Sequence, residues 1–351
     1  MIKKIQQDFS YYSHEFKDNY RKGVHRLRTI LASRAQAQAF VSNAGGTAVV
    51  LGYEPETPDK NAQELYALLA ASPYIDDAVQ TFLGSIYEAG AESQDAMYSD
   101  SARCLEILHD PVMSRAAGAG TVSAGKWIAT LAGQSCNLYR DMNAVAASDI
   151  AMTAVAASET AMEAVISGTI ALNAVAASKT AMTAVAANET AMAAVAASRV
   201  AMSAIIGNST ALNAVVTSSV AMAAVIGNST ALNAVVSSST AMAAIASSST
   251  ARTAITNSAT AKNALASSPL KTTVTKGNGN GWENRTIRNG MGYLISCYNA
   301  NSGGEAGSTW YKLDGAQTSQ PAGTTNVGKF FTSSLAIYWW SSTSSVTYIP
   351  C

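Results

Sequence analysis

The chain has 351 residues, a formal net charge of zero and only 13 % charged residues. It is long enough for two or three ordinary domains. Phosphate backbones are bound by clustered Lys and Arg, and no such run occurs, so nucleic acid is not an expected partner. No stretch reaches about 18 consecutive apolar residues, which argues against membrane insertion. Residues 1–8 lack the apolar segment of a signal peptide, so we expect assembly in a cytoplasm.

Residues 1–115 carry most of the charge and have the spacing of an ordinary helical domain. Gly45 and Gly46, and then residues 55–59, interrupt the helical pattern. The segments with apolar residues at helical spacing are 5–37, 61–71, 74–89 and 101–109. The following segment, 116–140, is rich in Gly and Ala and predicts a hinge.

From Asp141 to Leu270 the sequence repeats every ten residues without a change of phase, which gives thirteen decads. Position 2 is Met or Leu in eleven decads, but Arg252 and Lys262 in the last two. Position 5 is Val, Ile or Leu, position 4 is Ala, position 1 is Ala after the first decad, and position 8 is Ser, Asn or Gly. If ten residues make three helical turns, positions 4, 1, 8, 5 and 2 share one arc of about 144°.

A single helix would leave this stripe exposed to water. The pattern therefore favours a shaft of roughly 195 Å in which identical chains wind into an α-helical coiled coil, without fixing the number of chains. Its predicted core is Met152, Val155, Met162, Val165, Leu172, Val175, Met182, Val185, Met192, Val195, Met202, Ile205, Leu212, Val215, Met222, Val225, Leu232, Val235, Met242 and Ile245. The change to Arg252 and Lys262 predicts that the shaft loosens or changes structure before its end.

Two other interpretations of the decads stay open. Thr at position 10, which follows Gly207–Asn208–Ser209 and the same triplet at 227–229, could cap a short helix in every decad. That would give a stacked coil of short helices instead of one rod. The Ser, Thr and Val enrichment over 215–260 could instead support an intertwined β-fibre.

Residues 271–351 predict a small all-β tip. The segment 276–281, KGNGNG, breaks any helix, and short aromatic and β-branched runs then alternate with turn residues. The expected strands are 282–287, 292–298, 308–313, 329–337 and 346–349. Aromatic rings beside Asn and Arg can stack on sugars, which favours a glycan-binding role for this segment. The alternative interpretation is that the Trp rings form the core of a small domain. The candidate receptor-binding residues are Trp282, Arg285, Arg288, Trp310, Tyr311, Trp339 and Trp340.

The sequence contains no recognisable catalytic motif, so an enzyme, a cofactor and a metal are not expected. The histidines, His14, His25 and His109, lack metal-ligand spacing and fit solvated helix surfaces. Asp76 and Asp77 with Glu88 or Glu92 are interpreted as solvated carboxylates. Four cysteines, Cys104, Cys136, Cys297 and Cys351, are too scattered for a zinc site and too few for a disulfide scaffold. We expect free thiols, with Cys351 as a reactive exception.

Decads such as 239–248, STAMAAIASS, followed by a Gly- and aromatic-rich end, resemble bacteriophage tail-fibre, collar-fibre and appendage proteins. The resemblance implies an elongated multidomain fibre, a homotrimer located at the tail, neck or baseplate periphery of a virion. Residues 1–140 would attach to a tail, collar or baseplate protein, and residues 271–351 would recognise a host cell-surface glycan or protein. The resemblance carries over no binding residue, because receptor contacts in such fibres lie in variable tip loops.

Three alternatives come from other kinds of protein. A collar, neck or decoration fibre would have a mainly structural role. A bacterial surface adhesin stalk shares the plan of stalk and tip, but the missing export signal counts against it. An ice-binding or scaffolding Ala-Thr repeat needs Thr on a flat regular face, whereas the regular stripe here is Met, Val and Ala.

Overall fold

The computed structural model describes residues 10–16, 20–52, 60–86, 97–301 and 308–351. The chain forms two compact units, residues 1–185 and 186–351, whose boundary falls inside the decad repeat. Several sequence-based expectations lie outside the described residues: the first residues and the start of the helix over 5–37, the interruption at 55–59, and Glu88 and Glu92.

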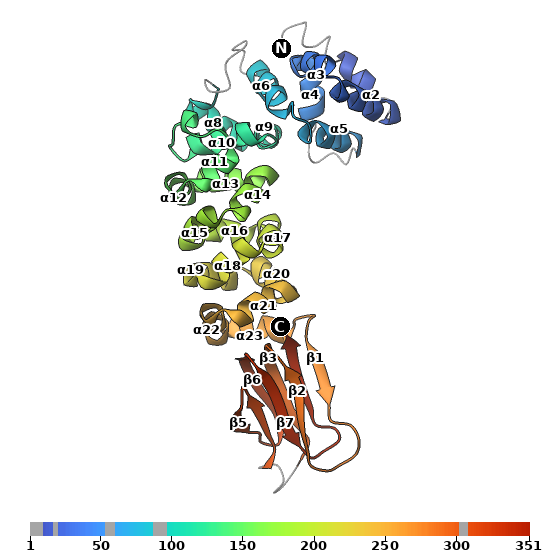
Figure 1. The fold of residues 1–351 in the computed structure, drawn as a ribbon, viewed down its shortest axis with the longest axis vertical. Helices are drawn as coiled ribbons and strands as arrows, with labels where there is room; N and C mark the ends of the chain where they lie inside the picture. Colours follow the sequence, from blue (N-terminus) through green and yellow to red (C-terminus); the bar gives the residue numbers. More distant parts are fainter. Residues whose placement is uncertain (1–9, 17–19, 53–59, 87–96, 302–307) are drawn as a thin grey trace. The chain divides into compact units, whose positions relative to one another are not determined.

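The first unit begins with a group of short helices (Figure 1), and aromatic side chains pack together among them. Phe16 and Phe40 are buried and meet edge to face at 5.8 Å, while Tyr12 stacks on Phe16 at 5.4 Å. A Cβ at Gly46 would lie 2.7 Å from the Phe40 ring, so this close approach requires glycine. The helices are α2 (Tyr20–Ala32), α3 (Arg34–Val41), α4 (Ala44–Leu51), α5 (Lys60–Ala70) and α6 (Ile75–Ile86).

The segment 116–140, predicted as a hinge, contains a packed helix over 121–131 and a short 3-10 helix over 136–138. Trp127 is fully buried, and its indole Nε1 donates to Cys104 O at 3.3 Å. Gly120 precedes the helix without a capping side chain, and Asp76 accepts from Ser123 N at 3.0 Å in its place. The Gly and Ala residues therefore serve close packing. The elements are α8 (Ser101–His109), α9 (Pro111–Ala117), α10 (Thr121–Leu131) and η1 (Cys136–Leu138).

The first short helix of the repeat begins at Met142, and each later one runs from position 9 of one decad to about position 7 of the next. Position 8 is the N-cap: Ser248, for example, has extended φ and ψ of −94° and 122°, and its Oγ accepts from Ala251 N. The helices are α11 (Met142–Ala147), α12 (Asp149–Ala157), α13 (Glu159–Ser167), α14 (Thr169–Ala177), α15 (Lys179–Ala187), α16 (Glu189–Ala197), α17 (Arg199–Gly207), α18 (Ser209–Thr217), α19 (Ser219–Gly227), α20 (Ser229–Val236), α21 (Ser239–Ser247), α22 (Ser249–Asn257) and α23 (Ala259–Ala266).

The favoured continuous helix is therefore wrong, as is the β-fibre, and the stacked coil of short helices is confirmed. One extended residue per decad turns the chain sharply: α12 and α13 meet at 101°, and α18 and α19 at 94°. The sequence placed the cap at position 10, two residues too late, because Ser and Asn at position 8 were interpreted as a polar core layer. Extended Ser and Asn satisfy free backbone N–H groups, which starts a new helix.

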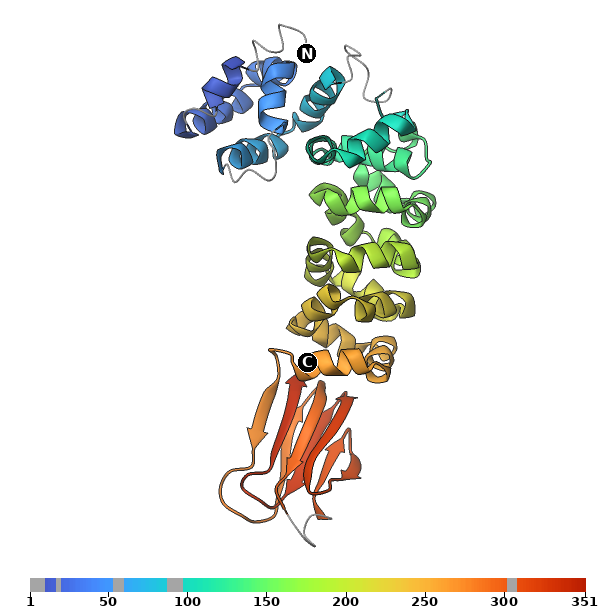
Figure 2. The same ribbon diagram turned by 180° about the vertical axis from the view of Figure 1, so that it is seen from behind.

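Successive helices stack into a coil within each unit. In the second unit α16 contacts α19, α17 contacts α20 and α18 contacts both α21 and α22, so a turn contains slightly more than three helices (Figures 1 and 2). Some position-8 serines also bind the preceding turn: Ser218 Oγ donates to Ala186 O at 2.5 Å, and Ser268 Oγ to Val236 O at 2.6 Å. One side chain thus caps a helix and joins two turns.

The stripe of Met, Leu, Val and Ile is covered within the chain itself. Every residue of the predicted shaft core, from Met152 to Ile245, is at most 5 % exposed. Position 6 is also buried in most decads, as at Val216 and Val236, although the sequence arithmetic placed it outside. The reason is that each helix packs against both the preceding and the following turn of the coil. The buried face of each helix is therefore wider than the face buried between two helices of a coiled coil.

We expect Ser248→Ala to destabilise the coil more than Ser198→Ala. Ser198 only caps its helix, through Ala201 N, whereas Ser248 also donates to Val216 O at 2.5 Å. Cap loss costs about 1 kcal/mol. Leaving the Val216 carbonyl without its partner adds about 1–3 kcal/mol. Urea unfolding followed by circular dichroism checks this, and equal losses for the two variants would contradict the bond between turns.

The second unit ends in a β-sandwich of two four-stranded antiparallel sheets, ordered β1-β8-β3-β6 and β2-β7-β4-β5. Leu294 and Val346 from one sheet pack against Ile337 and Trp339 from the other, and all four are fully buried. The β tip that the sequence predicted is thus present. The strands are β1 (Thr272–Thr275), β2 (Glu283–Asn289), β3 (Gly292–Asn299), β4 (Trp310–Leu313), β5 (Ala316–Ser319), β6 (Gly323–Phe331), β7 (Ser334–Trp339) and β8 (Ser345–Pro350).

Neither β1 nor β5 was predicted from the sequence, and the strand expected over 329–337 merged the end of β6 with β7. The turn at Thr332 and Ser333 divides them and is held by Asp314, whose carboxylate accepts from the backbone N–H of Thr332, Ser333 and Ser334. Desolvation raises the pKa of Asp314, but these hydrogen bonds outweigh it and hold that pKa well below its usual range. Asp314 and Gly315 have φ of 53° and 84°, the left-handed pair that an Asp-Gly hairpin turn requires.

Candidate functional site

The outer face of the β2-β7-β4-β5 sheet carries a row of aromatic rings. Trp282 stacks on Tyr338 at 4.8 Å between ring centroids, and Tyr338 stacks on Trp310 at 5.3 Å, with interplanar angles of 9° and 18°. Trp340 meets Trp282 edge to face at 5.4 Å, and Lys312 Nζ lies 4.5 Å from the Trp310 ring. Trp282 is 38 % exposed. The rings of the row stack on one another, so the ring faces between them are covered and the ring edges face solvent.

Strand register explains why these rings meet. Tyr338 pairs with Trp310 of β4 on one side and with Asn284 of β2 on the other. Directly paired residues of an antiparallel sheet point to the same face, so their side chains lie close enough to pack. Trp282 precedes β2, is exposed, and stacks on this central ring. Tyr338 was missed at the level of sequence because the expected strand joined β7 to the end of β6. The alternation of buried and outward-facing residues along β7 was therefore not assigned.

The structure places the seven predicted receptor-binding residues in different environments. Trp282, Trp310 and Trp340 belong to the aromatic row. Trp339 and Tyr311 are core residues at 0 % and 5 % exposure, so the core interpretation holds for them. Arg285 is exposed on β2. Arg288 Nη2 donates to Cys351 O at 2.9 Å and fixes the C-terminal residue.

The second unit is positively charged. Residues 186–351 contain nine Lys or Arg and four Asp or Glu, a net charge of +5, and residues 1–185 carry −5. Among the described acids of the second unit, Glu283 accepts from Trp339 Nε1 at 3.3 Å, and Asp314 is bound to the β6–β7 turn. An uncompensated field of this sign attracts anionic ligands over about one Debye length, roughly 8 Å at physiological salt.

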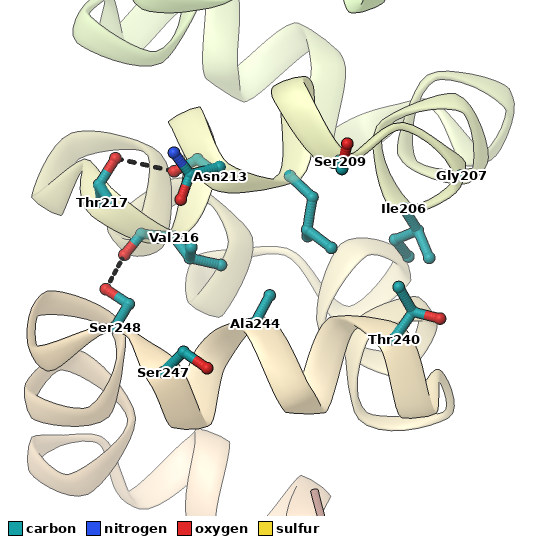
Figure 3. Close-up of a pocket in the computed structure, with 11 residues that line it drawn as sticks. Ile206, Gly207, Ser209, Asn213, Val216, Thr217, Thr240, Ala244, Ser247 and Ser248 are labelled. Carbon is teal, nitrogen blue, oxygen red and sulfur yellow. Dashed lines mark hydrogen bonds between the residues drawn. The ribbon is translucent and has the colours of Figure 1, made fainter.

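A concave site lies between two turns of the coil (Figure 3). This groove has a volume of about 620 Å³ and no charged side chain in its lining. Figure 3 shows Thr240 of α21 opposite Ile206 and Ala244 of α21 pointing into the groove, while Ser248 binds Val216 O at the other end. The lining residues are Ile206, Gly207, Ser209, Leu212, Asn213, Val216, Thr217, Thr240, Ala244, Ser247 and Ser248.

The groove exists only because helices stack, so sequence reasoning built on a continuous rod could not find it. Its one sequence signal is glycine at position 7, at Gly207 and Gly227, where other decads have Ala, Ser, Thr or Asn. A Cβ at either glycine would meet nothing within 4 Å. Neither glycine is therefore required by packing, and each leaves space open.

The four cysteines are free thiols, as predicted. Burial raises the pKa of Cys104 and Cys297 to about 12, and that of Cys351 to about 11, so none of these three is an activated thiolate. In the part of the chain that the structure describes, no three His, Cys, Asp or Glu side chains gather as metal ligands. His14, His25 and His109 are exposed.

Within the described ranges, no single helix has the length and apolar character needed to cross a membrane, and four bent pairs of consecutive helices reach that threshold only when each pair is taken together.

Comparison with protein-family models finds no match, and comparison with curated proteins finds none either.

Proposed function

We propose that this chain is a non-enzymatic binding protein of the bacteriophage fibre type, in which the coil is a spacer and the β-sandwich is the recognition tip. The observation that carries the proposal is the aromatic row of Trp282, Tyr338 and Trp310 on an outer sheet face, with Lys312 beside it. A stable sheet does not require three large rings on its solvent side. Such clusters, apolar with a polar rim, are typical of binding surfaces.

The target that fits this surface is a host cell-surface glycan. Ring edges and Trp282 offer apolar contact to a sugar, and Lys312 and the net charge of +5 of residues 186–351 favour an anionic polymer. Residues 1–140 would then attach the chain to a virion tail, collar or baseplate protein. The repeat supports the spacer role because its buried stripe leaves mainly Ala, Ser, Thr and Asn outside, a surface with few charges.

The physical argument for a trimeric coiled coil no longer applies, because the apolar stripe that was expected to join three chains is buried within a single chain. The homotrimer stays a prediction, and it would have to form through surfaces other than the stripe. Light scattering of the full chain measures this directly.

The test of the proposal uses the full chain on an array of bacterial polysaccharides and lipopolysaccharides. We expect binding to particular glycans, and a loss of at least about tenfold in affinity for Trp282→Ala, because hot-spot anchors contribute about 2 kcal/mol or more. Tyr298→Ala is the matched control, since Tyr298 is 42 % exposed on the other sheet. Equal binding by both variants, or no binding to any glycan, would reject the aromatic row as the recognition surface.

A further inference from the structure

The last two decads break the rule for position 2 at the place where the coil meets the sandwich. Met and Leu at this position are at most 5 % exposed in earlier decads, whereas Arg252 and Lys262 are only partly buried. The last three helices have no helix three places further along the chain. Strands take that place instead: α21 and α23 contact β3, and α22 contacts β6.

A pocket of about 320 Å³ lies at this junction, inside the second unit. Arg252, Thr253, Thr256 and Asn257 of α22 form one wall, and Lys329 and Phe330 of β6 form the other. Phe330 is held by the buried Tyr293, with 4.8 Å between ring centroids. The pocket thus combines two cations, polar side chains that can donate and accept hydrogen bonds, and one aromatic ring.

A third cation lies against the same strand. The Lys262 side chain would be 3.4 Å from a Cβ at Gly328, the neighbour of Lys329. Gly328 has a φ of 61°, so glycine suits this position for its backbone conformation as well as for the close approach of Lys262.

These cations have no acidic partner among the described residues. No ion pair joins Arg252, Lys262 or Lys329 to a carboxylate within the described ranges. Asp314 is the nearest described acid to Lys329 in the sequence, and its oxygens already accept from Thr332 and Ser333. Arg252 Nη1 donates to Ala246 O, which uses one of the five N–H donors of a guanidinium.

We propose that the junction pocket binds one anionic sugar residue, a pyranose that carries a carboxylate or a phosphate. Arg252 and Lys329 would bind the charged group through charge-assisted hydrogen bonds. Thr253, Thr256 and Asn257 would bind ring hydroxyls, and Phe330 would contact the apolar face of the ring. The volume lies at the lower end of the range for ligand pockets, about 300–1,000 Å³, which fits a single ring. This inference deepens the proposed glycan binding and depends on it only for biological meaning.

The test is calorimetric titration of the full chain with glucuronate, glucose 6-phosphate, glucose and inorganic phosphate. We expect saturable binding of at least one of the two anionic sugars, much weaker binding of glucose and of inorganic phosphate, and affinity that falls as salt rises. The two anionic probes show whether the pocket prefers a carboxylate or a phosphate. Comparable affinity for inorganic phosphate and glucose 6-phosphate would overturn the sugar pocket, and failure of both anionic sugars to bind would do the same.

The decisive variant is Arg252→Met, which restores the residue type of earlier decads and should keep the fold. It removes a charge-assisted hydrogen bond, so affinity should fall at least about tenfold. Arg199→Met is the matched control, because Arg199 is exposed at position 9 of an earlier decad. Lys329→Gln provides a second test on the strand side. Equal affinity for Arg252→Met and Arg199→Met would contradict the assignment.

The titration also separates this inference from the proposed function. If the anionic sugars do not bind but the glycan array is still recognised through Trp282, the pocket is wrong and the recognition tip stands. If the sugars bind through Arg252 but no glycan is recognised on the array, the pocket is right and the host-surface role fails.

Discussion

Met222→Asp is expected to unfold the coil of the second unit, with a loss of about 4 kcal/mol or more in the free energy of unfolding. Met222 is 1 % exposed at position 2 of its decad, in a stripe built of Met, Leu, Val, Ile and Ala, and the next cation at position 2 along the chain, Arg252, already donates to Ala246 O. A buried carboxylate without a partner either stays unpaired or takes up a proton, and both outcomes cost stability.

The neighbouring residue provides a control for Met222→Asp. Ala223 is exposed at position 3, so Ala223→Asp should cost only the lower helix propensity, about 0.5–0.7 kcal/mol. Urea unfolding followed by circular dichroism measures both variants. Similar losses would show that the stripe is not buried in the way that we describe.

Deletion of one whole decad, residues 219–228, is expected to leave a folded coil, whereas deletion of residues 219–223 should cost more than about 4 kcal/mol. The ten-residue deletion removes more apolar surface, including Val225, but it joins position 8 directly to position 9. Every remaining helix then keeps its cap and its inward face, as in other repeat proteins.

The five-residue deletion removes fewer atoms but changes the phase. Ser218 would then precede position 4, and only four residues would separate it from the next cap, Asn228. Four residues make barely one helical turn, which is too short to be stable or to fill its place in the stack. Circular dichroism and cooperativity of thermal unfolding distinguish the two deletions. Loss of the fold in both would contradict the independence of the decads.

The sequence predicted the buried side chains of the repeat better than its topology, and the reason is geometric. Within one decad, a continuous helix and a short helix present nearly the same face, so Met222 and Val225 are inward in both. What differs is one residue, position 8, whose φ and ψ decide whether the chain continues straight or turns by about 94–101°. Ser and Asn are common both at caps and in polar core layers, so residue type alone did not choose.

Whether the apolar stripe is covered by other chains or by the same chain follows from the conformation of position 8. A straight helix must find other chains to cover its stripe, whereas a coil covers the stripe with its own next turn. The contacts that decide between them join residues about 32 positions apart, such as Ser248 Oγ and Val216 O. No local pattern reports a separation of that size directly, although the capping serines were visible in the sequence.

The β tip shows a different limit. Aromatic content and turn residues were sufficient to predict an all-β segment, but not which rings are inside. Trp339 and Trp340 are adjacent, and one is fully buried in the core while the other joins the exposed row. Their assignment depends on the strand register of β7, which the turn at Thr332 and Ser333 sets.

The most direct test of the account measures the distance between residues 217 and 247 in one chain. Thr217→Cys and Ser247→Cys place two spin labels on exposed positions that line the same groove, in a Cys351→Ser background, with unlabelled chain added to suppress distances between molecules. A continuous helix separates these positions by roughly 45 Å, at about 1.5 Å per residue. The coil of short helices predicts less than roughly half of that distance, and a distribution centred near the longer value would contradict it.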